Sequence, residues 1–181
     1  MSDNSNTFIS ENYSYMNTLK NKNFPNISLP NQDGNLLNLH RSDTFRMVLY
    51  FYPMTGRPDK PLPDNWNNIP GAKGCTIQTC LFRDNYDEII SLNAVPIGIS
   101  TQGVDDNKEM TNRLKIPYDI LSDKKLELSN LLTIPTFSVD SKIFLKRITL
   151  IVEKKIIKKV FYPINNINKH IEEVLKWLKE N

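Results

Sequence analysis

An unbroken apolar and aromatic run, Met47–Tyr52, constrains this fold more than any other segment of the chain. The run ends at Pro53, and a strand without polar positions must be covered on both of its faces. Val95–Ser100 is a second run of the same kind. We therefore expect both strands in the centre of a sheet that carries helices on its two sides.

The segments around these strands alternate in type. Two short apolar runs around Asp33-Gly34 predict a hairpin that joins Ile27–Leu29 to Leu36–Leu39. Apolar residues at helical spacing predict helices over 75–92, 105–114, 124–132 and the C-terminal stripe that contains Ile167, Ile171, Val174, Leu175 and Leu178. Further strands are expected at 120–121, 144–152 and 156–161. This order predicts an α/β fold: a central mixed β-sheet flanked by helices, with an N-terminal β-hairpin extension.

Length and charge exclude several classes of protein. The 181 residues suffice for one domain, which we expect over 21–181 after a flexible tail over 1–20. The net charge of +3 comes without a concentrated basic tract, which argues against a nucleic-acid partner. No apolar run approaches the roughly 20 residues that span a bilayer, so no membrane role is expected. Residues 1–20 contain no signal-peptide pattern, and we expect a reducing, cytoplasmic location.

The segment 54–74 has no hydrophobic periodicity. It contains four prolines and three glycines. Loops of this length are uncommon in compact domains unless they have a function. Leu62 and Trp66 are its expected anchors to the rest of the domain.

Cys75 follows this loop at the expected start of a helix. Unpaired N–H groups and the positive end of the helix dipole stabilise a thiolate there, which is the form that attacks electrophiles. The alternative is a small buried apolar residue, which is the usual environment of a free cysteine.

The second cysteine, Cys80, stands five residues later. Five residues of intact helix rise about 7.5 Å and turn the side chain to another face, so a disulfide would require the first turns to unwind. Zinc is a poor alternative because His40 and His170 are distant in sequence. We therefore expect neither a metal nor another cofactor.

Several stretches together resemble the peroxiredoxins, in particular the Q-type or bacterioferritin-comigratory group. They are FYP at 51–53, PGAKGCTIQTCLFRD at 70–84, VPIGIST at 95–101, KRITLIV at 146–152 and the LP-x-x-DG stretch from Leu29 to Leu39. The resemblance covers roughly residues 22–178. It implies a thioredoxin fold and a thiol-dependent peroxidase that reduces hydrogen peroxide and organic hydroperoxides.

The resemblance also implies roles for individual residues. Cys75 matches the peroxidatic cysteine, which peroxide oxidises to a sulfenic acid. Cys80 matches a resolving cysteine, which closes a disulfide that a thioredoxin-type dithiol then reduces. Arg147 matches the arginine that faces the peroxidatic sulfur, and Pro53 matches the proline that shields it. The expected partners are thus a peroxide and a dithiol reductant, for a monomer or homodimer.

The active-site loop departs from the family pattern. The family places a Thr or Ser three residues before the peroxidatic cysteine, where this chain has Ala72. The inserted loop also separates Pro53 from Cys75. We expect Thr55 to supply the missing hydroxyl, and Thr76 is a poorer candidate. Residues 100–102 could line the pocket, but strand ends commonly use such residues as helix caps, and we prefer that interpretation.

Two other functions use the same cysteine pair. One is a thioredoxin-like thiol–disulfide oxidoreductase, although that chemistry usually employs C-x-x-C. The other is a redox sensor that forms the disulfide without catalytic turnover.

Overall fold

A computed structural model describes residues 14–40 and 45–181 of the chain. Its main sheet has five strands in the order β5-β4-β3-β8-β9. These strands are β3 (Arg46–Phe51), β4 (Ala94–Ser100), β5 (Ile120–Ser122), β8 (Ile148–Glu153) and β9 (Ile156–Phe161). β3 pairs in parallel with β4 and antiparallel with β8, so the sheet is mixed and β3 lies at its centre. This arrangement confirms the predicted thioredoxin fold.

The residues of β3 alternate between two hydrophobic cores because successive side chains of a strand point to opposite faces. Met47, Leu49 and Phe51 belong to one core, and Val48, Tyr50 and Tyr52 belong to the other. All six are buried, as the unbroken apolar run predicts.

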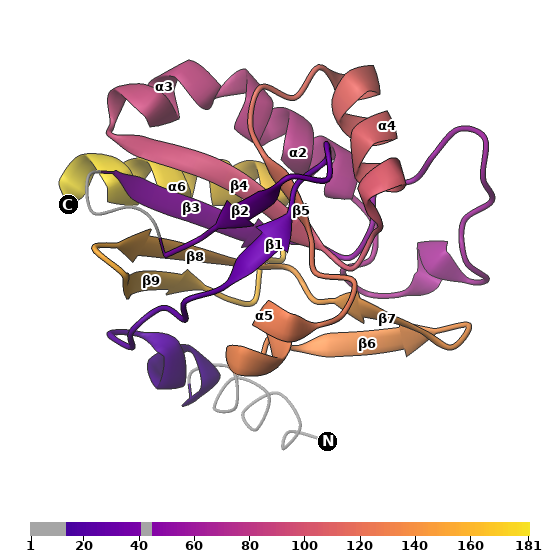
Figure 1. The fold of residues 1–181 in the computed structure, drawn as a ribbon, viewed down its shortest axis with the longest axis horizontal. Helices are drawn as coiled ribbons and strands as arrows, with labels where there is room; N and C mark the ends of the chain where they lie inside the picture. Colours follow the sequence, from indigo (N-terminus) through magenta and orange to yellow (C-terminus); the bar gives the residue numbers. More distant parts are fainter. Residues whose placement is uncertain (1–13, 41–44) are drawn as a thin grey trace.

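Helices pack on one side of the sheet, as Figure 1 shows, and their buried residues share a core with Tyr50. They are α2 (Cys75–Asp84), α3 (Tyr86–Ser91), α4 (Val104–Leu114) and α6 (Ile167–Glu180). The opposite face is covered by α5 (Glu127–Leu131) and by the hairpin of β1 (Ser28–Pro30) and β2 (Leu36–Asn38). β1 and β2 pair antiparallel, which confirms the predicted N-terminal hairpin.

The N-terminal segment packs against the edge of the main sheet. Residues 14–19 are helical, and Leu19 is buried in the core. Asn21 donates its backbone N–H to Ile157, whose own N–H donates to the carbonyl of Lys22. The end of the expected tail is therefore packed on edge strand β9, while residues 1–13 lie outside the described part.

Two predictions about element boundaries are wrong. The helix expected over 75–92 is interrupted at Asn85, whose side-chain amide donates to the carbonyl of Leu81 at 2.8 Å. Such local bonds compete with the helical ladder. The strand expected over 144–152 is instead divided between β7 (Lys142–Leu145) and β8, and β7 pairs with an unpredicted strand, β6 (Thr136–Val139). This division places Arg147 between the two strands.

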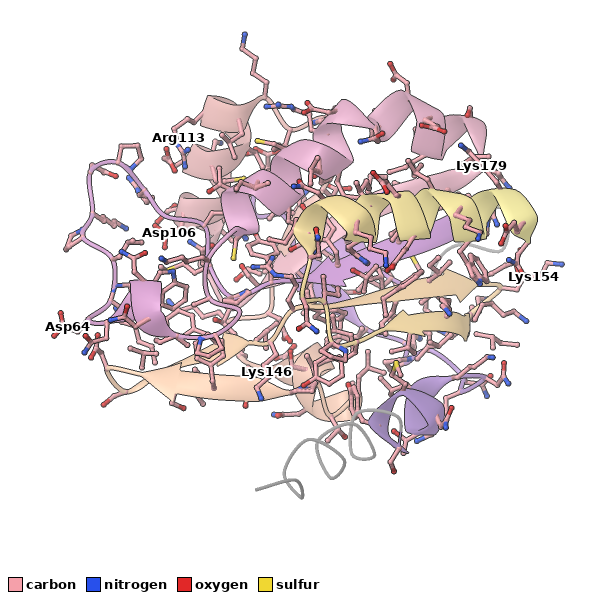
Figure 2. The ribbon with its side chains drawn as sticks, turned by 180° about the vertical axis from the view of Figure 1, so that it is seen from behind. Asp64, Asp106, Arg113, Lys146, Lys154 and Lys179 are labelled. Carbon is pink, nitrogen blue, oxygen red and sulfur yellow. The ribbon has the colours of Figure 1, made fainter. Side chains whose placement is uncertain are left out.

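The inserted loop is held to the domain near its start and at Trp66. Near its start, Gly56 accepts a hydrogen bond from Arg113 and Arg57 pairs with Asp106, both on α4. Farther along, Trp66 is 4% exposed and its ring centroid lies 4.9 Å from that of Phe144. Figure 2 shows Asp106 and Arg113 together on α4, and Asp64 at the far side of the loop.

One of the two predicted anchors of this loop is wrong. Trp66 lies in a short 3-10 helix (Trp66–Asn68) and is buried against the β6–β7 hairpin. Leu62, in contrast, is 42% exposed. The aromatic ring finds partners in the hairpin that the sequence did not predict, whereas Leu62 lines an open cleft.

Candidate active site

Cys75 is the first residue of α2. The preceding Gly74 adopts φ 94°, a left-handed conformation that glycine reaches without the steric cost of a Cβ. The first N–H groups of a helix have no acceptor within it. In α2 they lie at the end of the helix that carries Cys75. Cys75 itself is 2% exposed, so these groups act in a site from which water is largely excluded.

Arg147, 72 positions later in the chain, brings a cation to this sulfur from just before the start of β8. Its Nη2 lies 3.4 Å from Sγ of Cys75 and donates to the carbonyls of Lys73 at 2.8 Å and Gly71 at 3.3 Å. The guanidinium is thereby bound to the end of the inserted loop as well as to the cysteine. The side chain is 5% exposed, so its charge is weakly screened at the sulfur.

Gln78 holds the same guanidinium and was missed by the sequence reasoning. Its side-chain oxygen accepts a hydrogen bond from Nη1 of Arg147, and the residue is 1% exposed. Gln78 follows Cys75 by three positions, so both side chains lie on one face of α2. The signal available in the sequence was a polar residue three positions after Cys75, on the same side of the expected helix.

A second set of contacts fixes α2 on the sheet. The ring of Phe82 stacks on Tyr50 with centroids 4.4 Å apart. The hydroxyl of Tyr50 lies 3.0 Å from that of Tyr118, which donates to the carbonyl of Thr79 at 2.8 Å. Burial raises the pKa of Tyr50 and of Tyr118 well above the ordinary value, so both hydroxyls remain protonated donors. The middle of the helix is thus attached to β3.

Cys80 lies on the same helix and is partly buried. Both cysteines are free thiols. Sγ of Cys75 lies 3.5 Å from the carbonyl of Ala72, to which a protonated thiol can donate. Since both cysteines belong to one continuous helix, their sulfurs cannot join unless its first turns unwind.

Pro53 and Thr55 follow β3 directly, and both are buried. Thr55 is bound to Gln102 by three hydrogen bonds: its N–H and hydroxyl donate to Oε1 at 2.8 and 3.1 Å, and Nε2 donates to its carbonyl at 3.1 Å. Among the described residues, no hydrogen bond joins Thr55 to Cys75 or Arg147. The helix cap preferred for residues 100–102 is wrong, because α4 is preceded by Gly103 and has no side-chain cap, and Gln102 instead positions the start of the loop.

The inserted loop also borders a cleft of about 870 Å³, together with residues of the β6–β7 turn and the start of α4. Neither Cys75 nor Arg147 lines this cleft. In the described ranges, no group of three or more His, Cys, Asp or Glu side chains is arranged to hold a metal ion. No helix there is long and apolar enough to cross a membrane.

Comparison with known sequences identifies relatives. The model of the AhpC/TSA family matches residues 67–160. The chain is 30% identical over 161 residues to the chloroplastic peroxiredoxin Q of Arabidopsis thaliana, which covers 86% of this chain and 64% of the relative. It is 29% identical over 161 residues to peroxiredoxin Bcp of Escherichia coli K12, which covers 87% of this chain and 93% of the relative. The chain thus spans less than two thirds of the chloroplastic relative.

Solved structures share the fold. The crystal structure of peroxidoxin BcpB from Mycobacterium tuberculosis matches with a TM-score of 0.74 at 22% identity, over 90% of this chain and 97% of that one. The family match covers the helix with both cysteines, Arg147, and the strands β4, β5 and β8 of the main sheet with all but the last residue of β9, whereas β3 precedes it. The chain belongs to the AhpC/TSA family, and its relatives include peroxiredoxins of the Q and Bcp type.

Proposed function

We propose that this protein is a thiol-dependent peroxidase with Cys75 as its nucleophile. The observation that carries the proposal is the 3.4 Å approach of Arg147 Nη2 to Cys75 Sγ at the first turn of α2. A helix N-terminus and a buried guanidinium both favour a negative charge on the sulfur. The names of the relatives support the same reading, because they are peroxiredoxins.

In the first step the Cys75 thiolate attacks one oxygen of a hydroperoxide. A sulfur–oxygen bond forms and the oxygen–oxygen bond breaks, which leaves a sulfenic acid and releases water or an alcohol after protonation. Nη2 of Arg147 lies beside this sulfur, so the guanidinium can donate to the peroxide oxygens as charge develops on the leaving one. We propose hydrogen peroxide and organic hydroperoxides as the substrate class.

Cys80 is the proposed resolving residue. Its thiol condenses with the sulfenic acid, water leaves, and a disulfide joins the two sulfurs. The hydrogen bond from Arg147 to Gln78 belongs to α2 and is expected to break as the helix unwinds, whereas Lys73 and Gly71 lie before the helix. A thioredoxin-type dithiol then reduces the disulfide and becomes oxidised itself. A reducing compartment such as the cytoplasm would maintain this reductant, and we propose a monomer or homodimer as the acting form.

Pro53 and Thr55 are the remaining proposed site residues. Pro53 is buried at the end of β3, where it would shield the sulfur from bulk water. Thr55 is proposed to supply the hydroxyl that Ala72 lacks. In the resting structure this hydroxyl donates to Gln102, so its oxygen retains lone pairs that can accept from a peroxide proton.

Oxidation of the reduced protein by hydrogen peroxide, followed by stopped-flow and intact-mass measurement, tests the proposal. We expect wild type to lose a pair of hydrogens as the disulfide closes, and Cys80→Ser to gain one oxygen at Cys75. Cys75→Ser should not consume peroxide, and a wild-type rate in that variant would refute the proposal. Reduction of a test disulfide without peroxide would favour the oxidoreductase alternative, and a single stoichiometric oxidation without turnover would favour the sensor.

A further inference from the structure

Three positions after Cys80, the helix α2 carries an arginine, Arg83. Side chains at this spacing lie on one side of a helix, so the guanidinium of Arg83 and the thiol of Cys80 are neighbours. Cys80 is partly buried, and the side chain of Arg83 is 33% exposed. No step proposed above for the peroxidase reaction uses Arg83.

The guanidinium of Arg83 is fixed in place by two contacts. Its Nη1 donates to the carbonyl of Leu114, the last residue of α4, at 2.8 Å. Its Nε and Nη2 each lie 2.8 Å from Oδ1 of Asp84. The last carbonyls of a helix have no donor within it and lie at the negative end of its dipole, which favours a cation there. Figure 1 shows α2 and α4 side by side, so the charge of Arg83 has a fixed position between them.

The charge of Arg83 acts on the sulfur of Cys80. The hydrogen bond to Asp84 raises the pKa of Arg83, desolvation opposes this effect, and a negative charge on Cys80 raises the pKa further. Because the attraction between two charges is mutual, the guanidinium in turn favours the thiolate of Cys80. The partial exposure of Arg83 weakens this attraction, so we expect a modest effect.

Tyr118 is a second ionisable group that acts on Cys80. Burial raises the pKa of this tyrosine, so its hydroxyl stays neutral and donates to the carbonyl of Thr79 at 2.8 Å. Charged residues of the neighbouring helices form ion pairs: Arg113 with Glu109 on α4, and Lys169 with Glu173, Lys176 with Glu180 and Lys179 with Glu88 from α6. Of all these groups, Arg83 is the one that places a positive charge beside Cys80.

The part of α2 that contains Cys80 and Arg83 is attached to the rest of the domain. The carbonyl of Thr79 accepts the hydrogen bond from Tyr118, and the ring of Phe82 stacks on the sheet. Arg83 adds the bond to α4. We therefore expect the helix to stay folded from Thr79 onward when its first turn unwinds, so that Arg83 remains beside Cys80 while the disulfide closes.

We propose that Arg83 is a positioning residue for the second step of the reaction, in which it stabilises the thiolate of Cys80 and so accelerates closure of the disulfide. This proposal rests on the proposed peroxidase function. The thiolate attacks the sulfur of the Cys75 sulfenic acid, and the sulfur–sulfur bond forms as the sulfur–oxygen bond breaks. The departing hydroxide takes a proton from solvent and leaves as water.

Alkylation of Cys80 tests the electrostatic effect without any peroxide. The chain has two cysteines, so Cys75→Ser leaves Cys80 as its single thiol. Its rate of reaction with iodoacetamide is measured between about pH 6 and pH 10, and the midpoint of the profile reports formation of the thiolate. Adding Arg83→Gln should raise this midpoint by about 0.5–1 pH unit, whereas Arg83→Lys should retain most of the wild-type position. Lys179→Gln is the matched control, because it removes an equal charge that pairs with Glu88, and should not move the midpoint.

Rapid quenching of the protein with both cysteines, after one equivalent of hydrogen peroxide, separates the two steps by intact mass. Arg83→Gln should oxidise Cys75 at the wild-type rate and close the disulfide about two- to fourfold more slowly at pH 7, because the loss of thiolate outweighs the greater reactivity of each thiolate. At high pH, where both proteins carry the thiolate, the difference should disappear.

Three results would overturn the proposal. They are equal alkylation midpoints in Arg83→Gln and Lys179→Gln, a midpoint in Arg83→Lys as high as in Arg83→Gln, and a loss of closure rate that is the same at every pH. The lysine variant keeps the charge, so it distinguishes an electrostatic role from the bond between α2 and α4 alone. Because alkylation requires no peroxide, failure of this effect is distinct from failure of the peroxidase function.

Discussion

The side-chain oxygen of Gln78 holds the guanidinium of Arg147 one helical turn beyond Cys75. The same guanidinium lies 3.4 Å from the sulfur, so Gln78, with the carbonyls of Lys73 and Gly71, positions the cation relative to the nucleophile. Because α2 supplies both the cysteine and the glutamine, unwinding this helix removes the sulfur and the support of the arginine together. The resting site is therefore complete only while α2 is folded.

Gln78→Leu should slow the first oxidation by hydrogen peroxide about 10- to 100-fold, since Arg147 loses the acceptor that orients it. Stopped-flow kinetics of the reduced protein measures this rate. Gln78→Glu keeps an acceptor at the same place and should recover most of the rate. Equal rates in the leucine and glutamate variants would show that the bond to Arg147 has no role in positioning.

Thr55→Val and Thr55→Ser test the proposed hydroxyl. If the hydroxyl orients peroxide, the valine variant should oxidise about tenfold more slowly while the serine variant retains the rate. Both substitutions keep the backbone bonds to Gln102, so the stability of the loop changes little in either variant. A wild-type oxidation rate in Thr55→Val would show that the Thr55 hydroxyl does not orient peroxide and that the residue only holds the loop in place.

Gly74→Ala should destabilise the protein by about 1–3 kcal/mol in urea unfolding. A Cβ at this position would lie 2.3 Å from Cδ1 of Ile167 on α6, and φ 94° is itself unfavourable for alanine. Gly71→Ala is the matched control, because it also has a positive φ, of 80°, but open space around the added Cβ. Equal losses of stability in the two variants would mean that the clash of the added Cβ with Ile167 costs nothing beyond the backbone strain.

Acid should weaken the fold through His170. Burial, and next the charge of Arg147, lowers the pKa of this ring from 6.5 to about 4. Between these values the unfolded state binds the proton and the folded state does not, so stability decreases as the pH falls. The loss should approach about 3 kcal/mol near pH 4. Urea unfolding in piperazine and MES buffers measures it, and a profile equally steep in His170→Gln would contradict this origin.

Trp66→Ala should cost about 3 kcal/mol, because the indole is buried against Phe144 and Phe137. Limited proteolysis should then cleave the segment 54–74 faster than in wild type. Leu62→Ala is the control on the same loop, and since Leu62 is 42% exposed its stability should stay within about 0.5 kcal/mol of wild type. Equal sensitivity of the two variants to protease would show that Trp66 does not anchor the loop.

The sequence by itself determined the alternation of strands and helices around β3 and the centre of the sheet. The run Met47–Tyr52 has no polar position, and the structure buries both of its faces. The position of Cys75 at a helix start could also be predicted, because the end of the proline-rich loop and the onset of helical periodicity are local signals. Local signals of this kind exist wherever apolar residues recur at the spacing of a single helix or strand.

Only the tertiary structure decided how the site is assembled. Arg147 reaches Cys75 across 72 positions in the chain, and the resemblance to a family, not any local pattern, had placed them together. Gln78 was recognised only in the structure, Gln102 was expected to cap a helix and instead binds Thr55, and the hairpin that buries Trp66 was not predicted. Hydrogen bonds between side chains of different elements leave no periodic trace in a sequence, because their partners are set by how the elements pack and not by the burial pattern of either one.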